Sequence, residues 1–218
     1  MIVVVTGTGT EVGKTWFAAA TIEALRAAGH TLLARKPVQS FATDDPAPTD
    51  ADVLARATGE ATDDVCPPHR RLPLAVAPPM AAAGLGLPAF TIAELVAEVR
   101  SGLPVDHRDV IVFVEGAGGA RSPIADDGDT IALAHALAAD RVVIVADAGL
   151  GTINAVRLTV AALSSWTPVV ALNRYDDDND LHRANRDWLE ERDGFCVVTT
   201  PGRLADELTR RAASRDRS

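Results

Sequence analysis

A lysine and a threonine end a stretch rich in glycine and threonine, GTGTEVGKT, which runs from Gly7 to Thr15. An apolar run precedes this stretch and an alanine-rich run follows it, which is the strand, loop and helix context that a phosphate-binding loop requires. Lys14 would reach the β- and γ-phosphates, and the Thr15 hydroxyl would ligate Mg²⁺. An ordinary glycine-rich turn would not need the Gly-Lys-Thr ending. We therefore predict a nucleotide site whose backbone and side chains come from Gly9, Thr10, Glu11, Val12, Gly13, Lys14, Thr15 and Trp16.

Two further apolar runs end in a charged residue. The run Thr31–Lys36 ends in a lysine, and the run Val110–Val114 leads directly to Glu115. Taken alone, either charged residue is most simply a solvated residue at the end of a strand. Beside a phosphate site, however, Lys36 could stabilise charge on a transferring phosphoryl group, and Glu115 is placed like a Walker-B carboxylate that binds Mg²⁺. Lys14 and Lys36 are the candidate catalytic residues.

The elements that would position these groups alternate along the chain. Short β-branched runs predict buried parallel strands at Ile2–Thr6, Thr31–Lys36, Val110–Val114, Val142–Ala146, Val169–Leu172 and Phe195–Thr199. Helices are expected at Lys14–Ala28, Asp52–Thr58, Ile92–Ser101, Thr130–Ala138, Thr152–Ser164 and Leu181–Arg192. This alternation predicts an α/β fold, a parallel sheet flanked by helices on both faces, with ligands at the carboxyl ends of the strands.

The length of 218 residues suits a single domain that spans the whole chain. The segment 41–88 is irregular and rich in Pro, Ala and Asp, and we expect it to cover the site. The arginine-rich tail 210–218 is expected to be frayed. The side chains of Trp16 and Phe17, at the start of the first helix, are expected to pack.

Composition argues against several classes of protein. The net charge is −9, which disfavours a nucleic-acid-binding surface. No apolar run is long enough to span a bilayer, and no signal peptide is evident at Met1, so we expect a cytoplasmic protein without a membrane partner. Cys66 and Cys196 are far apart and read as isolated reduced thiols. The histidines are scattered, and no nucleophile arrangement is evident.

Four motifs together resemble those of dethiobiotin synthetases, which have a P-loop NTPase fold. They are GTGTEVGKT, KPVQS, VEGAGG and GLGTIN, in the same order and at similar separations as in that family. The resemblance runs from Val3 to about Asn173 and is loose between Phe41 and Pro88. It implies an ATP-dependent cyclo-ligase of biotin biosynthesis. Such an enzyme joins 7,8-diaminononanoate and CO₂ through a carbamate and a carbamic-phosphoric anhydride to form dethiobiotin.

The resemblance also implies roles for particular residues. Thr15, Asp52 and Glu115 would be the magnesium ligands, although Asp50 lies close to Asp52 and the choice between them stays open. Ser40 would contact the substrate. Asn173 would read the nucleotide base, or else be only a turn residue at a strand end. Further nucleotide contacts are expected from Asp52, Glu115, Gly116, Ala117, Gly118, Arg174, Thr200, Pro201 and Gly202.

The GLGTIN motif predicts a helix start. Thr152 is expected to N-cap a helix that begins at Ile153, which would leave free N–H groups for an anion. An N-cap alone is the simpler interpretation. The resemblance adds that this helix start binds the distant carboxylate of the substrate across a homodimer interface, so the substrate-binding set includes Gly151, Thr152, Ile153 and Asn154.

The chain departs from the family around the organic substrate. Phe41, Pro79 and Ala155 stand where the family usually has glycine, histidine and histidine, and Ala120–Ser122 replaces a more apolar stretch. Two other functions therefore stay open: another P-loop amidoligase acting on a different carboxylate, and a ParA/MinD-like ATPase switch. Such switches carry a second lysine at the position of Gly9, which counts against a switch here.

Overall fold

The computed structural model of this chain describes residues 1–105 and 109–215, with side chains described as far as residue 210. Six parallel strands form its main sheet, in the order β10-β9-β8-β1-β5-β2. They are β1 (Ile2–Gly7), β2 (Thr31–Arg35), β5 (Val110–Glu115), β8 (Arg141–Asp147), β9 (Val169–Asn173) and β10 (Cys196–Val198). Every predicted strand is confirmed, with ends that differ by at most a residue or so.

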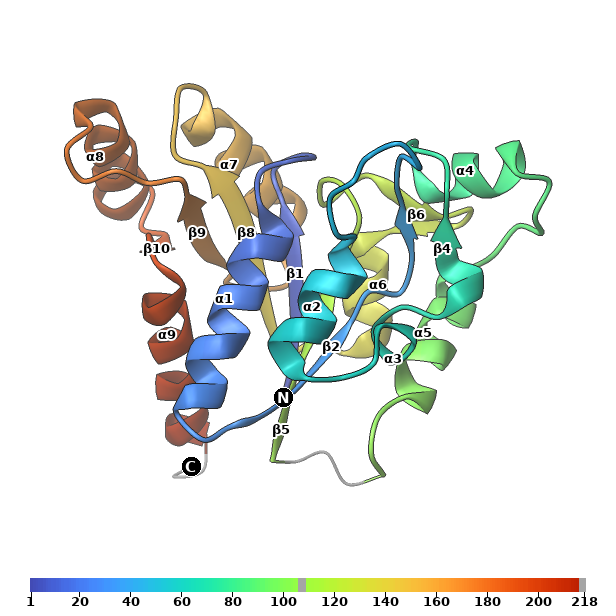
Figure 1. Ribbon diagram of the computed structural model, residues 1–218. Helices are drawn as coiled ribbons and strands as arrows, with labels where there is room; N and C mark the ends of the chain where they lie inside the picture. The colour runs from blue at the N-terminus through green and yellow to red at the C-terminus, as the bar shows by residue number, and fades with distance from the viewer. Residues whose placement is uncertain (106–108, 216–218) are drawn as a thin grey trace.

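Side chains alternate across the sheet and bury it on both faces. Val3 and Val5 of β1 belong to one apolar cluster, with Phe17 and Leu25, whereas Val4 belongs to a second cluster on the opposite face. Helices α1 (Lys14–Ala27), α2 (Asp50–Thr58) and α9 (Pro201–Arg215) cover the first face, and α5 (Ile92–Ser101) and α6 (Thr130–Leu137) cover the second (Figure 1). The predicted α/β architecture is therefore confirmed.

Most predicted helices are present, with some shifts. The helix expected from Asp52 begins at Asp50, and α7 is shorter than predicted, at Thr152–Ala162. The helix expected at Leu181–Arg192 divides into α8 (Asp180–Asp187) and a π-helical turn, η2 (Trp188–Arg192). Helix α9 was not predicted. It begins at Pro201, a residue well suited to the first helical position, and continues through Arg215, past the expected start of the tail.

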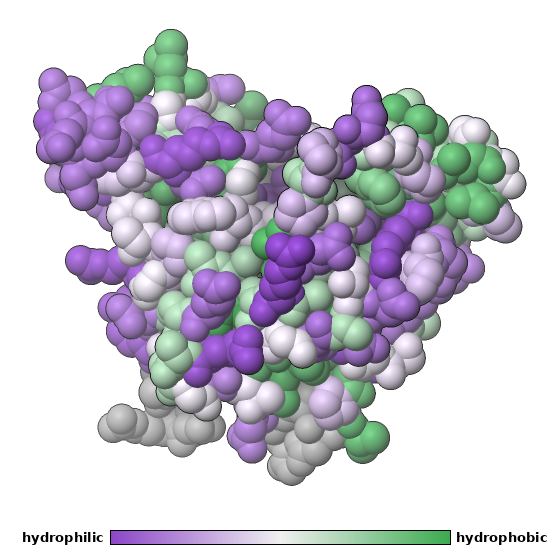
Figure 2. Space-filling view, in the orientation of Figure 1, coloured by the Kyte–Doolittle hydropathy of each residue, from purple (hydrophilic) through white to green (hydrophobic). Residues whose placement is uncertain are grey.

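The segment 41–88 carries more regular structure than expected. Besides α2 it contains α3 (Thr62–Val65), the 3-10 turn η1 (Pro68–Arg70), β4 (Arg71–Leu72) and α4 (Pro78–Gly84). Strand β4 pairs in parallel with β3 (Gln39–Ser40), and a separate small hairpin is made by β6 (Pro123–Ala125) and β7 (Gly128–Asp129). In Figure 2 apolar side chains gather over α4, where Met80 is 61% exposed.

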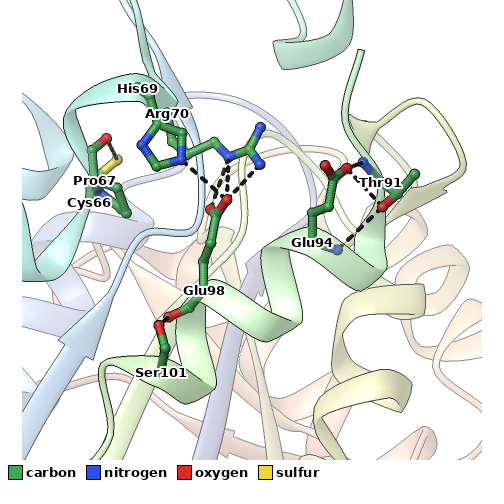
Figure 3. A network of polar contacts seen from close by, with 8 residues as sticks. All are labelled: Cys66, Pro67, His69, Arg70, Thr91, Glu94, Glu98 and Ser101. Atoms are coloured by element: carbon green, nitrogen blue, oxygen red, sulfur yellow. Dashed lines mark hydrogen bonds and ion pairs between the residues drawn. The ribbon is translucent and has the colours of Figure 1, made fainter. Parts of the chain in front are cut away.

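An ion pair ties this segment to helix α5 (Figure 3). Arg70 donates to Glu98 through Nε at 2.9 Å and Nη2 at 2.6 Å, and its guanidinium lies over the ring of Phe90. Burial alone would raise the pKa of Glu98, but the bonds from Arg70 and His69 outweigh it and hold the pKa below its usual range. Nearby, Thr91 and Glu94 form a capping box that starts α5. None of the helices within the described residues has the length and apolar character needed to cross a membrane.

Candidate active site

A cavity of about 920 Å³ opens at the carboxyl edge of the sheet. In Figure 2 the molecule is hollowed at its upper edge, between the side that carries α7 and α8 and the side that carries α4. The loop after β1 lines the cavity on one side, and residues from the 41–88 segment line it on the other. The lining includes Thr10, Lys14, Lys36, Ser40, Asp50 and Arg174.

The loop between β1 and α1 has the backbone of an anion cradle. Gly13, at the start of α1, has a φ of 87°, and an added Cβ would lie 2.0 Å from Asn173 Nδ2, so only glycine fits there. Lys14 folds back over the loop and donates to the Gly9 carbonyl at 2.9 Å. Burial lowers the pKa of Lys14, and the neighbouring Lys36 adds to this effect. The lysine is thus held over the loop where phosphates would bind.

Three oxygen-bearing side chains converge beside Lys14. The Thr15 hydroxyl lies 2.6 Å from Asp50 Oδ1 and 2.9 Å from Glu115 Oε1. The Lys36 ammonium lies 2.7 Å from Asp50 Oδ2 and 2.6 Å from Glu115 Oε1, and it donates to the Gly116 carbonyl at 3.0 Å. We call Thr15, Lys36, Asp50 and Glu115 the charged cluster. Strand ends β2 and β5, the start of α1 and the start of α2 each supply one member.

Burial gives the charged cluster unusual protonation properties. Lys36 and Glu115 are each 1% exposed. Burial alone would lower the pKa of Lys36, but Asp50 and Glu115 outweigh it and hold that pKa above its usual range. Burial likewise opposes ionisation of Asp50, yet Lys36 holds its pKa at about 2. Burial raises the pKa of Glu115, and the nearby Asp50 carboxylate adds to this rise. Glu115 Oε2 is buried and has no hydrogen-bond partner among the described residues.

The structure separates Asp50 from Asp52. The Asp52 carboxylate forms a capping box with Thr49 and accepts from the Thr62 hydroxyl at 3.0 Å, so it faces away from Thr15. Of the two aspartates between which the sequence left the choice open, the structure therefore brings Asp50, and not Asp52, into contact with Thr15 and Lys36. The sequence contained a signal for this arrangement. In the pattern Thr-x-x-Asp at a helix start, the Asp side chain bonds back to the backbone N–H of the Thr and so helps to cap the helix. Gln39, which sequence reasoning missed, supports the same helix start by accepting from Ala51 N at 3.0 Å.

Only some of the other predicted nucleotide contacts line the cavity. Ala117 and Gly118 line the cavity, and Gly116 supplies a carbonyl to Lys36. Asn173 donates to the Val12 carbonyl at 3.0 Å. The prediction that Trp16 packs is wrong, since its side chain is 58% exposed, whereas Phe17 is 1% exposed. The triplet Thr200, Pro201 and Gly202 lies at the start of α9 and does not line this cavity.

The predicted substrate residues lie in two places. Ser40 lines the cavity, but its hydroxyl donates to the Val76 carbonyl at 2.5 Å. The prediction of a Thr152 side-chain cap is wrong: α7 begins at Thr152, Gly151 takes the N-cap position with a φ of 91°, and no side chain caps the helix. Thr152 Oγ1 is buried without a partner among the described residues. Ile153 and Asn154 follow in the first turn of α7, outside this cavity.

Known proteins resemble this chain over most of its length. A family model described as an AAA domain matches residues 2–200. The ATP-dependent dethiobiotin synthetase BioD of Rhodococcus jostii is 38% identical, over 98% of this chain and 93% of the relative. The proteins of the same name from Haloferax mediterranei and Anaeromyxobacter dehalogenans are 36% and 39% identical, over 90% and 81% of this chain and 82% and 78% of the relatives.

Among solved structures, the MinC:MinD cell division protein complex of Aquifex aeolicus aligns at 16% identity with a TM-score of 0.49, over 90% of this chain and 78% of that chain. The curated relatives are 36–39% identical to this chain, over 78–93% of their own length. By that similarity, this chain belongs to the dethiobiotin synthetase family.

Proposed function

We propose that this chain is an ATP-dependent cyclo-ligase that forms dethiobiotin from 7,8-diaminononanoate, CO₂ and ATP, in biotin biosynthesis. The observation that carries the proposal is the charged cluster together with Lys14 of the phosphate loop. Two lysines, Lys14 and Lys36, bring positive charge to one end of the cavity. A carbamate and a γ-phosphate are both anionic, so a site that brings them together needs concentrated positive charge.

The proposed reaction has three steps. One amine of the substrate attacks CO₂, and an N–C bond forms as a proton is lost, which gives a carbamate. A carbamate oxygen attacks the γ-phosphorus of ATP, and ADP leaves, which gives a carbamic-phosphoric anhydride. The second amine then attacks the carbamate carbon, loses a proton and displaces phosphate, which closes the cyclic urea. No covalent bond to the protein is needed.

The two lysines take different parts in this scheme. Lys14 would hold the β- and γ-phosphates, because it lies over the loop and bonds to its Gly9 carbonyl. Lys36 would stabilise the charge that develops where carbamate and γ-phosphate meet, because it is fixed by two carboxylates and a carbonyl. The positive end of α1 adds to the field at the same place.

The residues of the charged cluster also fit a magnesium ion. Thr15, Asp50 and Glu115 present oxygen donors, the type that Mg²⁺ prefers, and Glu115 Oε2 is a buried acceptor without a partner. We propose these three as the residues that would hold it, with Asp50 in the place first expected for Asp52. A bound Mg²⁺ would neutralise phosphate charge.

The remaining proposed contacts come from the end of β9, from the turn after β5, from the wall of the cavity and from the start of α7. Asn173 and Arg174 lie beside the loop and would border the nucleotide, together with Gly116, Ala117 and Gly118. Ser40 would contact the organic substrate from the cavity wall. Gly151, Thr152, Ile153 and Asn154 would bind its distant carboxylate across a homodimer interface, with the assembly in the cytoplasm.

One experiment tests the proposal. Purified protein is incubated with diaminononanoate, labelled bicarbonate and MgATP, and the products are followed by mass spectrometry and phosphate release. We expect a cyclic urea that carries the label, in step with phosphate. Lys14→Ala should abolish both, since one preorganised charge is typically worth about 10²–10³ in rate. Phosphate release that needs no diamine would instead favour the ATPase switch, and a product only with another amine or carboxylate would favour a different amidoligase.

A further inference from the structure

Two side chains at the end of β9 hold successive carbonyls of the phosphate loop. Asn173 Nδ2 donates to the Val12 carbonyl at 3.0 Å, and Arg174 Nη2 donates to the Glu11 carbonyl at 2.9 Å. Arg174 also bonds, through Nη1, to Asp147 Oδ2 at 2.9 Å. Arg174 therefore links the phosphate loop to the end of β8, the strand that pairs with β9 in the sheet.

These bonds fix the direction of the backbone N–H groups. The described residues contain no cis peptide bond, so each carbonyl points away from the N–H of the next residue. When the Glu11 carbonyl is held toward Arg174, the Val12 N–H points to the opposite side. In the same way, the bond from Asn173 to the Val12 carbonyl turns the Gly13 N–H away from Asn173. N–H groups of this part of the loop are those that a phosphate loop offers to its anion.

The backbone on both sides of the bridge is strained. Glu11 has a φ of 59° and Arg174 a φ of 54°, and both are non-glycine residues in the left-handed region. Such conformations cost energy and persist only where surrounding contacts hold them. Arg174 Nη2 is the side-chain donor that meets the Glu11 carbonyl. The contact between the two strained residues is therefore the means by which the loop would keep its shape without a ligand.

Asp147 fixes the guanidinium from the other side. Its Oδ1 accepts from Gly149 N at 2.9 Å, and its Oδ2 accepts from Arg174. The bond from Gly149 N, with help from Arg174, holds the pKa of Asp147 below its usual range, so the carboxylate is ionised at neutral pH. Asp147 thus aims Arg174 at the loop while it shapes the turn that leads to α7.

We propose that Arg174 is a positioning residue that holds the phosphate loop in its anion-binding conformation through the Glu11 carbonyl, and that Asp147 orients it. The inference rests on the nucleotide-binding part of the proposed function. It differs from direct recognition of the nucleotide, because Arg174 acts on the backbone of the loop. Its removal should weaken binding of any polyphosphate, whatever base or ribose is attached.

The first test compares ATP with inorganic tripolyphosphate. Arg174→Met keeps the length of the side chain and removes its donors, and Arg174→Lys keeps a donor and a charge. Arg183→Met is the matched control, since Arg183 bonds to Asp177 and Asp180, outside the loop. Dissociation constants are measured by calorimetry with Mg²⁺ present. We expect Arg174→Met to raise the dissociation constants of ATP and of tripolyphosphate by the same factor, about tenfold. That factor corresponds to the loss of one hydrogen bond from a charged donor.

Kinetic constants and rescue separate this role from a purely structural one. We expect Arg174→Met to raise KM for ATP about tenfold and to change kcat by less than threefold, because saturating ATP restores the loop. Arg174→Lys should recover most of the affinity, and Arg183→Met should match the wild type. Equal losses in the Met and Lys variants, together with lowered thermal stability, would overturn the inference in favour of a structural role.

The Asp147→Asn variant decides between positioning and simple attraction. Asparagine keeps the carbonyl that can accept from Gly149 N, but it removes a negative charge. If Arg174 only attracts phosphate at a distance, the loss of that negative charge should tighten ATP binding. If Asp147 orients Arg174, ATP binding should weaken by severalfold, as we expect. Tighter binding would overturn the inference, and so would a loss confined to ATP with tripolyphosphate unaffected. Failure of the wild type to bind either ligand would instead refute the proposed function.

Discussion

Replacing Lys36 with methionine should leave two carboxylates facing each other without a cation. Lys36 is 1% exposed and contacts Glu115 at 2.6 Å, Asp50 at 2.7 Å and the Gly116 carbonyl at 3.0 Å. Asp50 has a side chain 43% exposed and can gain water, but Glu115 cannot, because its side chain is 1% exposed. Removing one partner of a buried pair typically costs about 3–5 kcal/mol of the free energy of unfolding. We expect the free energy of unfolding of Lys36→Met to be lower than that of the wild type by about this amount in the absence of Mg²⁺.

The assay is urea unfolding of four proteins in EDTA: wild type, Lys36→Met, Glu115→Gln and the double variant. If the cost comes from an uncompensated Glu115 charge, the double variant should be more stable than Lys36→Met, because both charges are then gone. Added Mg²⁺ should stabilise Lys36→Met more than the wild type, since an ion that binds only the folded state replaces the missing cation. Two results would refute this explanation of the charged cluster: a decrease in the free energy of unfolding of Lys36→Met below about 1 kcal/mol, or a double variant that is no more stable than Lys36→Met.

Three other changes test separate parts of the structure. Asp50→Ala should raise the Mg²⁺ concentration needed for half-maximal turnover by on the order of tenfold. Asp52→Ala should leave that concentration unchanged and lower the free energy of unfolding by about 1 kcal/mol through the lost cap. Equal Mg²⁺ dependence of the two variants would contradict the proposal that Asp50 holds the ion. Gly13→Ala should abolish calorimetric binding of MgATP, because its Cβ would lie 2.0 Å from Asn173 Nδ2 at a φ of 87°; normal binding would show that the loop tolerates another shape. Glu98→Gln should destabilise the fold by about 1–2 kcal/mol at pH 7. Because the folded pKa of Glu98 is lowered, its contribution is present above the unfolded pKa of about 4.3 and is lost as pH falls through the folded value. The two urea-unfolding curves should therefore converge below about pH 4, and a gap independent of pH would count against the ion pair.

Periodicity and local motifs were enough to predict the sheet and the phosphate loop. Strand β5 is buried along its whole length and reads as an uninterrupted apolar run that ends at Glu115, so both its position and its charged end were predictable. Lys36 was predicted to lie at the edge of the sheet for the same reason, because it ends a strand-like run. These features depend on neighbours in sequence, which a single chain displays directly.

Features that depend on distant neighbours were harder to predict. Helix α9 was missed because its Arg-rich end looked like a tail, yet Leu204 and Leu208 are each at most 1% exposed in the core that α1 shares. The exposure of Trp16 follows from its place on α1, which its hydrophobicity does not reveal. The bridge from Arg174 to Glu11 joins residues 163 positions apart, and no local pattern indicates it.

If ATP phosphorylates a carbamate beside Lys36, one carbamate oxygen leaves with the released phosphate, and ¹⁸O labelling detects that transfer. The enzyme is mixed with diaminononanoate, MgATP and freshly dissolved ¹⁸O-labelled CO₂ for a single turnover, and the released phosphate is analysed by mass spectrometry. We expect phosphate that carries one ¹⁸O atom for each cyclic urea formed, because the carbamate oxygen leaves with the phosphoryl group. We also expect Lys36→Gln to bind MgATP but to form little urea and little labelled phosphate. Unlabelled phosphate formed together with cyclic urea would show that the phosphoryl group is not transferred to a carbamate oxygen.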